Sequence, residues 1–449
     1  IETISVLVAD DPDNTTAVEL LREALENASP EAASIAVESL KQAIYANPEN
    51  VSLVNLLAQI QARSGKVEEA AKLLRDSSAK LLPSDRASAS MLQVALGDLL
   101  LRADKPQEAV EAYRAALVAR GLDGADSLAE DEREFAMHVF SRMIQVLKGA
   151  DRITEAKDVI ERARKMLGPR DLFADREMIS LLRETGKRTD ALVVVKAVRT
   201  RVPNDYGFIR LEATLLTETG RVDEAVALIR KLIAIPSGIP AVTPPVSGAG
   251  ESIAVAVPAS DAFSNYLFIS NLDTQANRGK AAAEAANQAY AVARDAERKQ
   301  IARLTLATAQ QMSGDVKAAE ATLRELIKET PGNPIALNNL GYFLLERDDR
   351  LQEGFDLIQQ ALKVDPTNPS YLDSLGWAYY RLGKLADAEK NLKEALRLDS
   401  SSGTIHEHLG DVYQKQGKYD LAKGAWNRAA SLFTEGGDVA RVKRKLAGR

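Results

Sequence analysis

The sequence predicts an all-α protein, a right-handed superhelical solenoid of about eleven stacked helical hairpins. Two observations predict it. A pattern of large and small apolar residues returns about every 34 residues along the chain, and 45% of the residues are hydrophobic although only 5% are aromatic. Such a composition is typical of chains built from strong helix formers. Because the pattern covers nearly all of the 449 residues, one extended array explains the length better than several unlike domains.

The clearest hairpins lie near the C-terminal end of the sequence. Each has a Leu-Gly pair followed by an aromatic residue in its first helix and an Ala-x3-large element in its second, as in Leu375-Gly376-x2-Tyr379 with Ala388-x3-Leu392 and in Leu409-Gly410-x2-Tyr413 with Ala422-x3-Trp426. The second element recurs upstream at Ala70, Ala109, Ala156, Ala191, Ala225 and Ala319. Small residues at these positions let two helices cross closely, and large ones fill the space beside them.

Glycines fall between the two helices of most hairpins, where a left-handed turn ends the first helix. They are Gly65, Gly186, Gly220, Gly314, Gly383 and Gly417. Where glycine is missing, an aspartate is expected to take the turn, at Asp104, Asp151 and Asp348. Prolines at Pro48, Pro203, Pro331 and Pro366 mark the ends of hairpins, because proline stops one helix before the next begins.

One stretch, 235–258, is rich in Pro, Gly and Ser and breaks the repeat. A helix cannot run through it. We therefore expect an N-terminal block of repeats at 1–234, a linker or insertion at 235–271 and a C-terminal block at 272–449. The insertion is either a long loop without a role of its own, or, at Ser252 to Val257, a strand that pairs with another chain.

Charge and composition exclude several classes of function. The net charge of -6 gives no basic face for nucleic acid or for purely electrostatic binding to a membrane. The chain has no cysteine, so thiolate chemistry and Cys-type zinc sites are excluded. No apolar run is long enough to span a membrane. No phosphate-binding loop, GxSxG or HExxH motif occurs, and we expect no catalytic residues, no metal and no cofactor.

The three histidines are His138, His406 and His408. Residues two apart on a helix point in very different directions, so His406 and His408 are poorly placed to share a metal. We expect a structural role for His406 and His408, with His406 at a core position of its repeat.

Two runs carry a resemblance to a known family: Ala336-Leu-Asn-Asn-Leu-Gly-Tyr-Phe-Leu and Tyr371-Leu-Asp-Ser-Leu-Gly-Trp-Ala-Tyr-Tyr-Arg-Leu-Gly. Together with the 34-residue period they resemble the tetratricopeptide repeat (TPR). More narrowly, the sequence resembles bacterial cell-envelope TPR scaffold proteins and lipoproteins, such as the adaptor of a carboxyl-terminal processing protease. It departs from them in showing no lipobox and in its Pro-rich insertion.

The resemblance implies a non-catalytic scaffold that holds a protein partner, such as a protease or a secretion component, in the bacterial periplasm or at the outer membrane. A cytoplasmic location is the alternative. Because the chain begins at Ile1 without Met and reads there like the end of a helix, we expect an upstream segment. A rival hypothesis makes the array an appendage or regulatory region of a larger enzyme, or of a polysaccharide or pilus assembly machine.

Some TPR proteins bind acidic C-termini through a clamp of Lys, Asn and Arg side chains. At the matching places the last three repeats have Asn338 and Tyr342, then Ser374, then Thr404 and His408, so we expect no such clamp here. Helical register places a different set on the concave face. We predict that the partner-binding residues are Asn338, Tyr342, Asp373, Trp377, Tyr380, Glu407 and Asp411, an aromatic cluster flanked by carboxylates that suits apolar and basic side chains.

Overall fold

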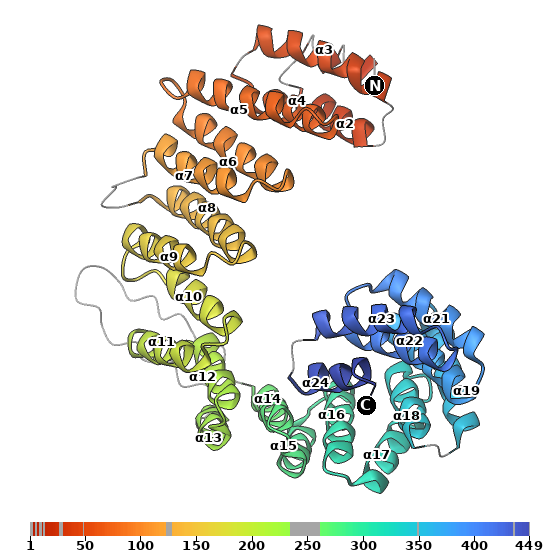
Figure 1. Ribbon diagram of the computed structural model, residues 1–449. Helices are drawn as coiled ribbons and strands as arrows, with labels where there is room; N and C mark the ends of the chain where they lie inside the picture. Colours follow the sequence, from red (N-terminus) through yellow and green to blue (C-terminus); the bar gives the residue numbers. More distant parts are fainter. Residues whose placement is uncertain are drawn as a thin grey trace. The chain divides into compact units, whose positions relative to one another are not determined.

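The structure is a computed structural model that describes residues 3–4, 7–8, 11, 14–26, 30–47, 49–122, 128–233, 261–347, 350–433 and 436–448. Every regular element within these ranges is a helix, and the predicted all-α solenoid is confirmed. Taken in order, α2 to α23 form eleven successive pairs, of which nine are seen to pack helix against helix in the described ranges, and α24 follows them (Figure 1). The chain forms two compact units, residues 1–208 and 209–449.

Among the described residues of the first unit, ten helices have both ends, and an eleventh begins there and runs on into the second unit. They are α2 (Thr15–Glu26), α3 (Pro30–Ala46), α4 (Val51–Arg63), α5 (Val67–Leu81), α6 (Arg86–Arg102), α7 (Pro106–Arg120), α8 (Glu130–Gly149), α9 (Ile153–Leu167), α10 (Phe173–Glu184), α11 (Arg188–Arg201) and the first residues of α12 (Tyr206–Glu218). From α4 to α10 each helix packs on the helix before and the helix after it. This sequential stacking is the arrangement of a solenoid.

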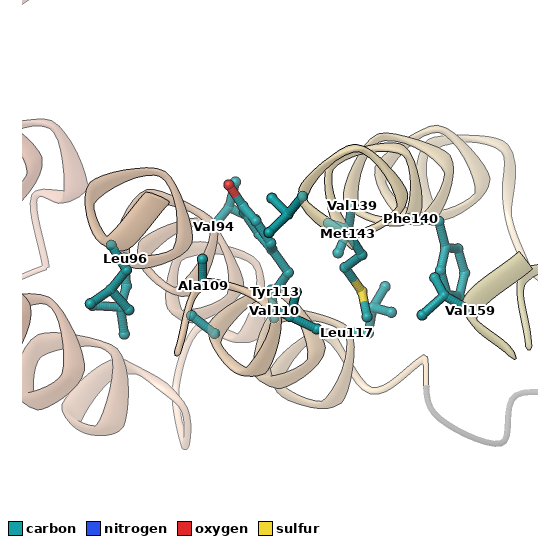
Figure 2. Close-up of a cluster of buried hydrophobic side chains, with 14 of the residues drawn as sticks. Val94, Leu96, Ala109, Val110, Tyr113, Leu117, Val139, Phe140, Met143 and Val159 are labelled. Atoms are coloured by element: carbon teal, nitrogen blue, oxygen red, sulfur yellow. The ribbon is translucent and has the colours of Figure 1, made fainter. Parts of the chain in front are cut away.

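The core of the first unit runs continuously through α5 to α9. Tyr113 and Phe140 are fully buried within it, and Figure 2 shows Tyr113 among the apolar side chains of this cluster, with its hydroxyl oxygen at one edge. A Cβ atom on Gly97 would lie 2.4 Å from the Tyr113 ring. A small residue in α6 is therefore what lets a large one in α7 enter the core.

The second unit contains the rest of α12 and twelve further helices among the described residues. They are α13 (Val222–Ile233), α14 (Ala262–Gln275), α15 (Gly279–Val292), α16 (Ala296–Met312), α17 (Val316–Glu329), α18 (Pro334–Glu346), α19 (Leu351–Val364), α20 (Pro369–Arg381), α21 (Leu385–Leu398), α22 (Gly403–Lys415), α23 (Tyr419–Leu432) and α24 (Gly436–Leu446). Gly376 faces Leu392 and the Ala388 carbonyl, as the repeat pattern predicts.

The turns and caps explain where the helices begin and end. All six predicted turn glycines, and Asp104 and Asp151, have positive φ; Asp348 lies outside the described residues. First helices of several pairs begin with a side-chain cap that is not part of the repeat motif. Asn50, Asp85, Asn333 and Asn368 each accept a hydrogen bond from a backbone N–H three residues on, which satisfies a donor at the helix end.

The predicted insertion lies mostly in residues 234–260, outside the described part of the chain. Its last ten residues, 262–271, belong to α14, which pairs with α15, so these residues are part of a repeat. Ser270 takes the place of the crossing glycine and donates a hydrogen bond of 2.8 Å to the Ala282 carbonyl. Asn277, with φ of 56°, takes the left-handed turn. No helix in the described ranges is both long enough and apolar enough to cross a bilayer.

Candidate functional site

The predicted partner-binding residues lie on one face of three adjacent first helices, α18, α20 and α22, which pack side by side. Asn338, Asp373 and Glu407 occupy equivalent positions of successive repeats, and so do Tyr342, Trp377 and Asp411, one helical turn further on. Residues four apart share a helix face. The seven residues, which come from three helices, therefore lie on one continuous surface.

Three aromatic side chains and one imidazole form the centre of this surface, and we call them the aromatic row: Tyr342, Trp377, Tyr380 and His408. The Trp377 ring is stacked between Tyr380, at 4.7 Å between centroids, and His408, at 4.4 Å. Tyr342 lies 6.4 Å from the His408 ring. The two tyrosines and Trp377 are half-buried. Each therefore both packs against its neighbours and keeps part of its surface open.

Polar groups fix the aromatic row in place. The Trp377 Nε1–H donates a hydrogen bond of 2.6 Å to the Glu346 carboxylate, and the Lys415 ammonium lies 4.7 Å from the centre of the Tyr380 ring. Burial raises the pKa of the Tyr342 and Tyr380 hydroxyls, with nearby carboxylates adding to the effect. Both hydroxyls therefore stay protonated at neutral pH and remain hydrogen-bond donors.

His408 is the buried member of the row and pairs with Asp373, its Nδ1 lying 2.8 Å from the carboxylate Oδ1. Burial alone lowers the pKa of an imidazole, but the adjacent Asp373 charge and hydrogen bond outweigh it, with Asp411 and Glu407 contributing, and the pKa of His408 is raised above 6.5. The Asp373 carboxylate thus favours the protonated form of the imidazole that is stacked on Trp377.

The carboxylates of α22 are already paired within the chain. Glu407 accepts hydrogen bonds of 2.9 and 2.7 Å from Arg441, and Lys445 lies 2.8 Å from Glu407 and 2.6 Å from Asp411. Asp411 also accepts from Trp426. Burial raises the pKa of Glu407, but the bonds from Arg441 and Lys445 prevail and lower it to about 2.

This pairing corrects one expectation from the sequence. Glu407 and Asp411 were expected to attract basic side chains of a partner, but α24 supplies those cations itself. Arg441 follows Glu407 by 34 residues, as Lys445 follows Asp411, so α24 stands where the first helix of a further repeat would stand. The repeat period was the signal that could have identified both residues.

Asn338, at the other end of the surface, has an unusual environment. Its side chain is 8% exposed, and its Oδ1 atom accepts no hydrogen bond in the part of the chain that the structure describes. A buried acceptor without a partner costs about 1–3 kcal/mol. The atom lies on the same helix face as Tyr342.

The histidines differ from expectation in one respect. His406, expected at a core position, is half-exposed and lies 3.2 Å from the Ser400 carbonyl; the buried histidine is His408. Because α22 begins at Gly403, the inward stripe passes through Ile405, His408 and Leu409 instead. His138 is exposed and accepts a hydrogen bond from Arg142. Nowhere in the described ranges do three or more His, Asp or Glu side chains gather as metal ligands would.

Comparison with known proteins places the chain in a family. Two tetratricopeptide-repeat profiles match it, one over residues 33–85 and 304–369 and the other over residues 376–417. A TPR repeat-containing protein of Pseudomonas aeruginosa is 48% identical over 83 residues, which is 18% of this chain and 14% of that protein. The chain therefore matches only a small part of the length of this relative.

Several solved helical-repeat structures are similar at low identity. Yeast Tom70 is 11% identical with a TM-score of 0.47, covering 96% of this chain and 95% of its own. A TPR protein of Thermus thermophilus is 22% identical with a TM-score of 0.37, covering 41% of this chain and 97% of its own. The repeat motifs, the family profiles and the eleven helix pairs agree, and the chain belongs to the tetratricopeptide-repeat superfamily.

Proposed function

We propose that this protein is a non-catalytic scaffold that holds a segment of a partner protein against the aromatic row of its second unit. Tetratricopeptide repeats serve protein–protein interaction in general. The observation that supports the proposal most is the half-open stack of Tyr380, Trp377 and His408. Trp and Tyr dominate the energetics of protein interfaces because they offer large, rigid contact areas.

The chemistry of the surface defines the kind of segment that fits. Apolar or aromatic side chains of the partner would lie on Tyr342, Trp377 and Tyr380. Asn338 Oδ1 is buried and has no described donor, so a rotation of this side chain would let it accept a hydrogen bond from a backbone N–H of the partner. Because the carboxylates of α22 are neutralised by α24, the segment needs no strong positive charge. We place a protease or a secretion component of a bacterial envelope first among the candidate partners, on the sequence resemblance.

Site-specific photocrosslinking in the native cell tests this proposal. A photoreactive phenylalanine analogue at Tyr380 should capture the partner, whereas the same analogue at Tyr419 should not. Tyr419 is a matched control because it is also an aromatic residue of the second unit, it is 66% exposed, and it lies on α23, outside the row. Equal capture by the two positions, or capture at Tyr419 alone, would show that the partner does not bind at the aromatic row.

A further inference from the structure

The last helix of the second unit, α24, is held in place by few contacts. It packs on α23, and among its described side chains only Val442 is fully buried, in a cluster shared with α22 and α23. Leu446 is partly buried against the same cluster. A helix of 11 residues is too short to be stable by itself in water. α24 therefore stays folded only while it is docked.

Two cations of α24 face two buried carboxylates of α22. Arg441 donates two hydrogen bonds to Glu407, and Lys445 lies 2.8 Å from Glu407 and 2.6 Å from Asp411. The cations are four residues apart, and so are the carboxylates, so each pair shares one helix face. Glu407 and Asp411 are 4% and 9% exposed. Because a buried carboxylate is costly without a cation beside it, this surface requires a basic occupant.

The opposite face of α24 takes no part in this contact. Lys443 and Arg444 are exposed, and neither forms an ion pair with any residue that the structure describes. α24 is therefore a basic amphipathic helix, with Arg441, Val442 and Lys445 on its docked face. The two faces carry the same number of cations, so the effect of position can be separated from the effect of charge.

We infer that the surface under α24 is a binding site for a basic amphipathic helix of a partner protein, which takes the place of α24. The partner helix carries an arginine and a lysine four residues apart, which pair with Glu407 and Asp411, and an apolar residue in the place of Val442. Short helices with few buried side chains open locally, and the partner helix binds the surface when α24 opens. The site adjoins the aromatic row but uses the carboxylates of α22, so it adds a second partner to the proposed function.

Peptide binding to the full chain tests the inference. The probe is a fluorescein-labelled peptide of residues 436–447, followed by fluorescence anisotropy. The receptor is the full chain with Arg441→Glu and Lys445→Glu, two changes that repel α24 from Glu407 and Asp411 and free the surface. We expect saturable binding to this variant, at least about tenfold tighter than to the unaltered chain, in which the tethered α24 competes at a high effective concentration.

Two altered peptides show which face of the helix makes the contact. The peptide with Lys443→Glu and Arg444→Glu keeps the docked face and should bind this variant as the unaltered peptide does. The peptide with Arg441→Glu and Lys445→Glu has the same net charge but a reversed docked face, and it should bind at least about tenfold more weakly. Because both peptides meet the same protein, the comparison does not depend on a second protein variant.

Hydrogen exchange in the unaltered chain shows whether the peptide replaces α24, and it needs no protein variant. The peptide with Lys443→Glu and Arg444→Glu differs in mass from the α24 of the chain, so mass spectrometry distinguishes the two. At about 1 mM, which is comparable with the effective concentration of a tethered helix, this peptide should accelerate exchange of the amides in 437–448 at least about twofold. Exchange in α20 should not change.

Three results would overturn the inference. The first is no binding of the unaltered peptide to the variant with Arg441→Glu and Lys445→Glu up to about 1 mM. The second is equal binding of the two altered peptides, which would show that net charge alone attracts them. The third is unchanged exchange of α24 in the unaltered chain at about 1 mM peptide. None of these tests involves Tyr380, so crosslinking there succeeds or fails separately.

Discussion

Replacing Glu407 by Gln should release α24 from the end of the second unit. The substitution keeps the shape of the side chain but removes the charge that Arg441 and Lys445 share. An isolated helix of 11 residues is too short to be stable in water, so α24 depends on such contacts with α22 and on the burial of Val442. Loss of the charge should therefore appear first as local opening of α24.

The size of the effect follows from the pKa of Glu407. Its fall from 4.5 to about 2 corresponds to about 3 kcal/mol at about 1.4 kcal/mol per pKa unit. Gln still accepts a hydrogen bond, and Arg441 is 45% exposed and so is screened by solvent. We therefore expect about 1–2 kcal/mol, which is about 5- to 30-fold faster hydrogen exchange of the α24 amides.

Hydrogen exchange read by mass spectrometry measures this, with Glu389→Gln as the matched control. Glu389 also has a pKa lowered to about 2, by hydrogen bonds from Lys393 and Lys418, but it lies on α21 and does not contact α24. The control should leave exchange in 437–448 unchanged. The reasoning is refuted if Glu407→Gln leaves α24 exchange within about twofold of wild type, or if both variants accelerate it equally.

Three further predictions concern the same unit. Gly376→Ala should lower stability by about 1–3 kcal/mol, because its Cβ would lie 2.6 Å from Leu392; an unchanged melting temperature would contradict this. The pKa of His408 is raised above 6.5, so its stabilisation is full below that pH and is lost as the pH rises through the folded-state value. Wild type should therefore lose more stability than His408→Asn between about pH 6 and about pH 9. Parallel pH profiles of the melting temperature for the two proteins would contradict this prediction. Asn338→Leu should leave the melting temperature unchanged or raise it yet weaken partner binding; a large loss of stability would mean that the Asn338 side chain is satisfied.

The repeat motif predicted most of the fold because each residue type in it has one physical task. Glycine at Gly383 and Gly417 ends a helix with positive φ, and Gly376 admits Leu392 at a helix crossing. The pair α14 and α15 was only partly recognised because Ser270 and Asn277 perform these two tasks instead of glycine. Ser270 donates a hydrogen bond at the helix crossing, and Asn277 tolerates the left-handed turn. A pattern that requires glycine at these two positions does not include them.

The candidate site was predicted less completely than the fold. Helical register places residues of α18, α20 and α22 on one face, because register depends only on spacing. The sequence did not indicate that His408 would stack on Trp377, since the choice of a buried histidine depends on where α22 begins. Nor did it reveal that Arg441 and Lys445 would neutralise Glu407, because α24 lacks the apolar motif of a repeat even though it keeps the period.

The dissociation constant of the crosslinked partner for Trp377→Ala, compared with Tyr419→Ala, tests the central claim most directly. Trp377 is the middle ring of the aromatic row, and removing it should weaken binding by about 2 kcal/mol or more, roughly 30-fold, while Tyr419→Ala has no effect. Circular dichroism would show that Trp377→Ala remains folded under the assay conditions. A lower melting temperature with an unchanged dissociation constant would mean that Trp377 only packs between repeats and that the partner binds elsewhere.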